Sequence, residues 1–307
     1  MSLPIEETIA DLGNSDKPLR SSRLTELTNL NQEEMGLFKQ GWAAIERKRQ
    51  RQIMNRLVEL TEDSFELNFD SIFASCLKDE DTEVRSKVIE GLWENEDASL
   101  IVPLVDMLNK DSSERIRAAA ATALGKFAML AELKKLRSCY ADKVCQGLLT
   151  VINDKGRTIE VRRRALEAAS PLSVPEVSKA ILEAYQSHDS KLKASAIYAM
   201  GKNCAYSWLP MLLKELASPD VEIRYEAATA CGELGEKEAM PHLTELINDA
   251  DTEVQLAAIR ALGKIGGSEA RECLEQCLSN SSEAARQVAG EALHELEMEE
   301  APFSFRA

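Results

Sequence analysis

Apolar and polar residues recur with a long, fixed period through most of the chain. Similar segments start with a polar residue and continue with an apolar residue and several alanines. We take the first apolar residue of each as an anchor: Val84, Ile116, Val161, Leu192, Ile223, Val254 and Ala285. Successive anchors lie 32, 45, 31, 31, 31 and 31 residues apart. Such a constant spacing predicts a repeat architecture.

Each anchor lies at the start of an amphipathic helix, which we call the B helix. Three residues before every anchor stands a side chain that can accept a hydrogen bond from the first helical turn, as at Asp220 and Asp251. Apolar or small residues follow at +3, +4, +7, +8 and +11 from the anchor and form one stripe of the helix. Upstream, leucine-type residues at −11 and −7 predict an A helix. Each repeat is therefore predicted to be a helical hairpin.

A single hairpin of 31 residues cannot bury its own apolar stripe. Burial requires stacking on neighbouring hairpins, so the sequence predicts an all-α fold, an α-solenoid of about eight stacked antiparallel helical hairpins. Small residues recur in phase at +9, where we expect either close approach of a neighbouring helix or the end of the B helix: Gly125, Gly201, Gly232 and Gly263.

The ends of the array differ from its middle. Stepping back one period from the first anchor reaches Ile53, and Asn31 with Glu34 forms a plausible capping box, which predicts a degenerate capping hairpin. The 45-residue step predicts an insertion that lengthens helices or adds a loop. The predicted organisation is a mobile segment over 1–22, a capping hairpin over 23–62, a repeat array over 63–295 with an insertion near 131–145, and a mobile acidic tail over 296–307.

Composition and charge narrow the function class. The chain has 307 residues and a net charge of −15, which disfavours nucleic acid along its body and favours a basic partner. No long apolar run and no signal-like start are present, so we expect no membrane partner and no export. Seven cysteines without a CxxC pair are typical of reduced thiols in the cytoplasm, where we expect the protein to be located.

The repeated pattern D-x-x-[VI]-R-x-x-A-x-x-A-L-G, with P-x-L-x-x-L upstream, resembles the short HEAT-like repeats first named from phycobilisome lyases. The resemblance covers residues 67–295, and more weakly 31–61. It implies a scaffold that binds another protein on a concave face lined by the B helices. Two related families carry chemistry: the bilin lyases, and deoxyhypusine hydroxylase with its di-iron centre.

The residues do not support the di-iron chemistry. The hydroxylase resemblance implies His-Glu pairs just after the arginine of several B helices, but the seven copies retain one glutamate there, Glu226, and no histidine. Cys273 and Cys277 have a metal-ligand spacing without further donors in phase. Three isolated histidines are expected on the surface: His188, His242 and His294. We therefore expect no catalytic residue, no metal and no cofactor.

The face opposite the core stripe is the candidate partner-binding surface. At 100° per residue, this direction holds +2, +6 and +9. Tyrosine and arginine commonly anchor interfaces, and an exposed apolar residue beside them would strengthen the case. The predicted partner-binding residues are Arg163, Tyr198, Tyr225, Leu256, Arg260 and Trp93. The two tyrosines could instead cover the junctions between hairpins.

The arginines at +1 are interpreted differently, as a structural ladder that pairs with turn carboxylates of adjacent hairpins. The sequence thus favours a non-catalytic scaffold for protein–protein interaction. The alternative is a tetrapyrrole lyase or chaperone-like protein that binds bilin or haem.

Overall fold

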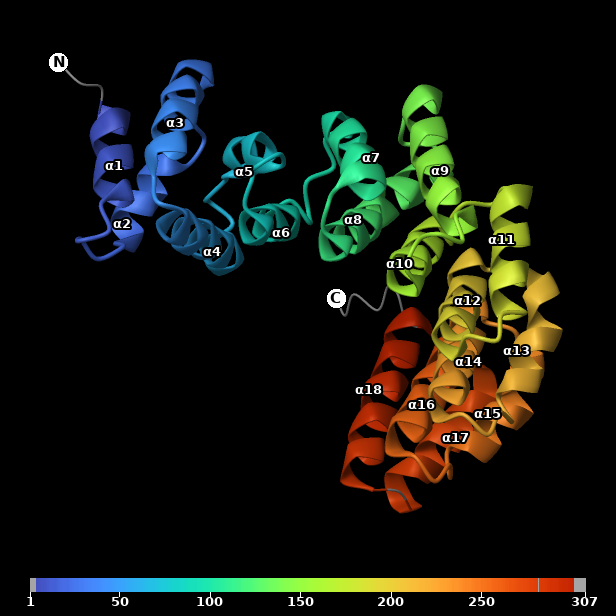
Figure 1. Cartoon of the computed structure of the whole chain (residues 1–307). Coiled ribbons are helices and arrows are strands. Elements are labelled where there is room, and N and C mark those ends of the chain that lie inside the picture. Colours follow the sequence, from blue (N-terminus) through green and yellow to red (C-terminus); the bar gives the residue numbers. More distant parts are fainter. Residues whose placement is uncertain (1–3, 281, 301–307) are drawn as a thin grey trace. The chain divides into compact units, whose positions relative to one another are not determined.

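The computed structural model describes residues 4–280 and 282–300, and this part of the chain is helical without any strand. The chain divides into two compact units, each considered separately below. The N-terminal unit comprises Met1–Leu130 with Leu136–Gly147, and the C-terminal unit comprises Ala131–Lys135 with Leu148–Ala307. The boundary passes through the segment where the sequence predicts an insertion. Figure 1 shows the helices coloured along the chain.

The helices alternate as short A and longer B elements through most of the chain. The first eight are α1 (Pro4–Gly13), α2 (Ser21–Leu24), α3 (Gln32–Ala44), α4 (Arg47–Asp63), α5 (Asp70–Cys76), α6 (Thr82–Gly91), α7 (Ile101–Lys110) and α8 (Glu114–Glu132). They are followed by α9 (Ser138–Asn153), α10 (Ile159–Ala169), α11 (Pro175–Tyr185), α12 (Ser190–Asn203), α13 (Leu209–Glu215) and α14 (Val221–Leu234). The last are α15 (Met240–Leu246), α16 (Thr252–Ile265), α17 (Gly267–Asn280) and α18 (Glu283–Glu300). Short 3₁₀ turns lie at Thr25–Leu27, Ala98–Leu100, Tyr206–Trp208 and Lys237–Ala239.

Most predicted helix caps are observed. The carboxylates of Asp81, Asp189, Asp220 and Asp251 accept hydrogen bonds from the first backbone N–H groups of their B helices, which satisfies donors that a helix leaves free at its start. Thr158 differs, because its side chain makes no cap hydrogen bond to α10 and its hydroxyl is buried without a partner.

The B helices of the C-terminal unit stack directly on one another. In sequence order α10, α12, α14, α16 and α18 each pack against the next, and Figure 1 shows α12, α14, α16 and α18 side by side. A Cβ added at Gly201 would lie 2.7 Å from the Cα of Ala230, and one at Gly232 would lie 2.7 Å from the Cα of Ala261. The glycines at +9 therefore permit close helix approach, as predicted.

This stacking corrects the predicted inner face. Where position +9 holds a glycine in the C-terminal unit, it contacts the next B helix and is part of the packing, not of an open surface. Each B helix is buried on its A-helix side and also along its neighbouring B helices. The side chains at +6 and +10 are half-buried or exposed in each of these B helices, whereas those at +3 are buried in α12, α16 and α18, so the open direction lies at +6 and +10.

Two of the arginines at +1, Arg85 and Arg224, make the predicted pairing with a turn carboxylate of the next hairpin. Arg117 instead pairs with Glu114 of its own helix, and Arg162 donates to the carbonyl of Ile152. In the N-terminal unit, the buried guanidinium of Arg85 lies 2.8 Å from the carboxylate of Asp111 in the next A-to-B turn. In the C-terminal unit, Arg224 makes the same 2.8 Å contact with Asp249 and also donates to the carbonyl of Ser218. These two bidentate pairs each tie a B helix to the A-to-B turn of the next hairpin.

The predicted mobile segment over residues 1–22 is wrong for residues 4–13, which form α1. Ile5, Ile9 and Leu12 are buried at helical spacing, and α1 packs against α3. The segment has few apolar residues, but they share one helix face and therefore suffice for docking. The buried guanidinium of Arg49 donates to the backbone carbonyls of Leu12 and Lys17 and so fixes the end of this segment. Residues 1–3 lie outside the described part.

The predicted capping hairpin is formed by α3 and α4. The reciprocal capping box of Asn31 and Glu34 is present, and Ile53 is buried on α4. The predicted insertion lengthens helices, since α8 has 19 residues and α9 has 16. At the other end α18 continues to Glu300, so the first five residues of the predicted acidic tail are helical. Residues 301–307 lie outside the described part.

Candidate functional site

The structure distributes the predicted partner-binding residues over both units. In the C-terminal unit, α10 carries Arg163, α12 carries Tyr198, α14 carries Tyr225, and α16 carries Leu256 and Arg260. These residues therefore lie on four B helices that stack in succession. The sixth residue, Trp93, follows α6 in the N-terminal unit and is not part of this group.

Their exposure separates packing residues from surface residues. Leu256 is 8% exposed, so the expectation of an exposed apolar anchor is wrong at this position. Position +2 is buried in α12 and α16, and half-buried in α10 and α14. Tyr198 and Tyr225 are half-buried, whereas Arg260 is exposed.

A connected group of polar side chains crosses the same B helices, and we call it the polar strip. It is defined by side chains that interact with one another between α10 and α16: Arg163, Glu167, Ser195, Tyr198, Lys202, Glu226, Glu233 and Lys264. Tyr225 and Arg260 lie beside it in sequence, on α14 and α16.

At the α10 end of the polar strip, Arg163 is held in a hydrogen-bonded group. Its Nε donates to the hydroxyl of Ser195 over 3.0 Å, and that hydroxyl donates to Glu167 over 2.6 Å. The guanidinium also lies 3.2 Å from Glu160. Arg163 therefore joins α10 to α12, and much of its hydrogen-bonding capacity is used within the protein.

At the other end, a carboxylate joins two lysines from different helices. Glu233 on α14 lies 3.1 Å from the Nζ of Lys202 on α12 and 2.6 Å from the Nζ of Lys264 on α16. These cations hold the pKa of Glu233 below its usual range, against the effect of burial, which raises it. Lys202 also lies 6.0 Å from the centre of the Tyr198 ring. The polar strip thus carries both signs of charge, although the chain as a whole is acidic.

Between these two groups lies Glu226, whose importance the sequence did not reveal. Burial raises the pKa of its carboxyl to about 7, and the negative charges of Glu167 and Glu222 act in the same direction, while Arg163 opposes them. In the sequence, Glu226 is distinguished only as a glutamate at a position where the other repeats hold different residues. The sequence does not show that the carboxylates of Glu167, Glu222 and Glu226 lie close to one another.

The remaining candidate chemistry is dispersed. No group of three or more metal-ligating side chains occurs among the described residues. His188, His242 and His294 are all exposed. Cys277 is buried, and Cys273 lies near the hydroxyl of Thr244 at 3.6 Å.

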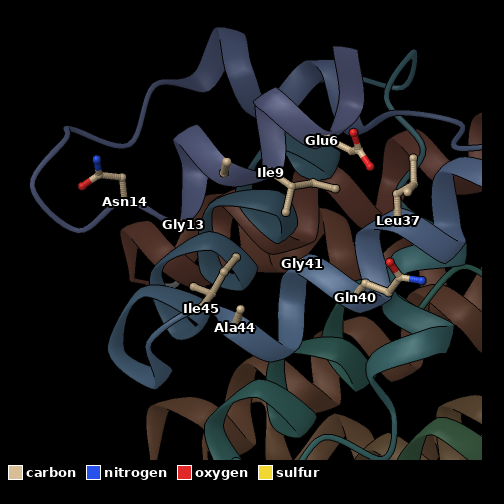
Figure 2. A pocket seen from close by; sticks show the side chains of 10 residues that line it. Glu6, Ile9, Gly13, Asn14, Leu37, Gln40, Gly41, Ala44 and Ile45 are labelled. Carbon is tan, nitrogen blue, oxygen red and sulfur yellow. The ribbon is translucent and has the colours of Figure 1, made fainter. Parts of the chain in front are cut away.

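A cavity of about 430 Å³ lies between α1 and α3 in the N-terminal unit (Figure 2). Its walls combine the apolar side chains of Ile9, Leu37 and Ile45 with the backbone of Gly13 and Gly41. The one ionisable residue that lines it is Glu6. Its lining therefore lacks a pair of titratable groups for acid–base chemistry.

Among the described helices, none has the length and apolarity required to cross a membrane.

Comparison with known proteins gives one informative result. A family model for HEAT repeats matches residues 70–144 and 209–294, together a little over half of the chain. No curated protein sequence matched the chain.

Several solved structures share a helical-repeat resemblance. YibA from Escherichia coli is 18% identical over 80% of this chain and 95% of its own, with a TM-score of 0.47. An engineered protein is 17% identical over 95% of this chain and 88% of its own, with a TM-score of 0.44. Human deoxyhypusine hydroxylase in complex with glycerol is 18% identical over 95% of this chain and 96% of its own, with a TM-score of 0.37. At these values none of them indicates a function for this chain.

Proposed function

Because the chain belongs to the HEAT repeat family, whose stacked hairpins form extended binding surfaces, we propose that it is a non-catalytic scaffold for protein–protein interaction. The C-terminal unit binds a partner protein on the polar strip, with Tyr198, Tyr225 and Arg260 as contact residues. Arg163 lines the same surface and holds Glu167 in place. Leu256 contributes to the packing beneath it.

The observation that carries this proposal is the environment of Glu226. Its carboxyl is half-buried close to Glu167 and Glu222, and within the described residues it makes no hydrogen bond or ion pair. The hydroxyls of Tyr198 and Tyr225 are likewise unpaired there. A lysine or arginine of a partner would offset the repulsion between the carboxylates and gain a charge-assisted hydrogen bond. The partner segment is therefore basic where it meets α14.

Site-specific cross-linking tests this surface directly. A photoreactive amino acid placed at position 225 should capture a partner from native lysate that the same group at position 206 does not. Tyr206 is a suitable control because it is exposed in the same unit but is not part of the polar strip; it lies on the 3₁₀ turn before α13. The captured protein should be lost when Tyr198→Ala and Glu226→Gln are added, with helicity by circular dichroism unchanged.

Identical capture from positions 225 and 206, or capture that survives both substitutions, would contradict binding at the polar strip.

The tetrapyrrole alternative is tested separately by adding bilin or haem to the purified protein. A scaffold of the proposed kind should leave the visible absorption bands of both pigments unshifted.

A further inference from the structure

A second surface lies in the N-terminal unit, where the linkers after α4 and α6 form a cleft of about 420 Å³. This volume falls in the range of about 300–1,000 Å³ that ligand pockets commonly have. Two large aromatic side chains line it and face solvent: Phe65 is 97% exposed and Trp93 is 68% exposed. Adjacent exposed aromatic residues in a hollow are typical of an interaction site rather than of a scattered apolar surface.

The backbone that carries both aromatic residues is fixed. Beyond Phe65, the N–H of Asn68 donates to the Thr28 hydroxyl over 2.9 Å, and its carbonyl accepts from the N–H of Asn29 over 2.9 Å. The carbonyl of Trp93 accepts from the Nζ of Lys126 over 2.9 Å. The cleft walls are therefore held in place before any partner binds, which lowers the entropic cost of binding.

The two linkers are also joined to each other. The amide of Asn95, two residues after Trp93, donates to the carboxylate of Asp70 at the start of α5 over 2.7 Å. Both residues line the cleft. The spacing between its walls is thus set by a direct hydrogen bond across the cleft.

The charge of the segments around the cleft is mainly negative, with Glu59 and Glu90 paired to Arg56 and Lys87. Segments 59–70 and 90–97 contain nine carboxylates and no lysine or arginine. Glu62 and Glu94 line the cleft, are exposed and form no ion pair within the described residues. The neighbouring Lys126 is occupied by the carbonyls of Leu92 and Trp93. An anionic ligand would be repelled here, whereas a cation would be attracted.

We propose that this cleft, lined by Phe65, Trp93, Glu62, Asp70 and Glu94, binds an arginine side chain presented by an extended segment of a protein partner. A guanidinium can stack on an aromatic face while its N–H groups pair with carboxylates, so it matches both features of the cleft together. The inference goes beyond the proposed function, since the residues and the unit differ from those of the polar strip.

Intrinsic fluorescence gives a readout specific to this cleft. Of the three tryptophans, Trp42 and Trp208 are buried and Trp93 is exposed, so a change in emission on binding reports mainly on Trp93. The probe is a tryptophan-free octapeptide of alternating arginine and serine, compared with the same peptide carrying glutamine in place of arginine. The arginine peptide should give a saturable change that weakens with salt, and the glutamine peptide should bind at least about tenfold more weakly.

Variants at exposed positions test the cleft without disturbing the core. Phe65→Ala and the double variant Glu62→Gln, Glu94→Gln should each weaken the arginine peptide about fivefold or more. Tyr206→Ala and Glu176→Gln, exposed residues in the other unit, serve as matched controls and should leave affinity unchanged. Affinity for Trp93→Ala, measured by calorimetry, should fall as for Phe65→Ala.

Three results would overturn the proposal. The first is equal binding of the two peptides, and the second is undiminished binding by the Phe65 and Glu62, Glu94 variants. The third is a preference for an apolar peptide independent of salt, which would mean that the cleft binds an apolar segment instead. If arginine-peptide binding fails while cross-linking from position 225 still captures a partner, the proposal for the cleft is wrong and the proposal for the polar strip stands. The two proposals can therefore fail separately.

Discussion

At the residue scale, Glu226 makes stability depend on pH in a predictable direction. Its folded-state pKa of about 7 lies above that of an unfolded glutamate, which is about 4.3. Between these two pH values the carboxyl is therefore protonated in the folded chain and ionised in the unfolded chain. The resulting stability is complete below the unfolded pKa and is lost as pH rises through 7. Glu226→Gln removes this dependence because the amide does not titrate.

Urea unfolding at pH 5 and pH 8 measures the difference. Between these values the wild-type protein should lose about 1–2 kcal/mol more of its free energy of unfolding than Glu226→Gln, a figure reduced for solvent screening of the half-buried carboxyl. Glu176→Gln, an exposed carboxylate on α11, is the control and should follow the wild type. Parallel pH profiles for wild type and Glu226→Gln would show that burial does not raise this pKa.

At the element scale, α1 depends on a buried arginine from α4. Replacing Arg49 with alanine leaves the carbonyls of Leu12 and Lys17 without their donor, which should cost about 2 kcal/mol and release α1 from α3. Limited trypsin digestion should then cut faster after Arg20, because the bond after Lys17 precedes a proline and resists trypsin. The neighbouring exposed Lys48 provides the control, because Lys48→Ala should leave the cleavage rate unchanged. Equal rates for both variants would mean that apolar packing alone holds α1.

The elements also show what the sequence could predict. The hairpins, their aspartate caps and the arginine pairs follow from local pattern, because these residues recur in phase in most repeats. The exposed face of the B helices does not follow from local pattern, because it depends on how closely neighbouring B helices approach one another. That approach buries Leu256, which an isolated helix would expose. Likewise, the proximity of Glu226 and Glu167 depends on the relative positions of α10 and α14, which the sequence does not give. For residues 1–22 the prediction used total apolar content, and it overlooked that the few apolar residues share one face of α1.

At the scale of the whole molecule, repeat stacking confines the effect of a substitution. Gly232→Ala forces a methyl group against the backbone of Ala261, and we expect a loss of about 2 kcal/mol despite the better helix propensity of alanine. Each repeat gains stability from its neighbours, so hydrogen exchange should accelerate in α14 and α16 while α3–α6 stay protected. Gly36→Ala, with no atom within 4 Å of the new methyl group, should instead slightly stabilise α3. Uniform loss of protection from α3 to α16 in Gly232→Ala would show that the two units unfold as one.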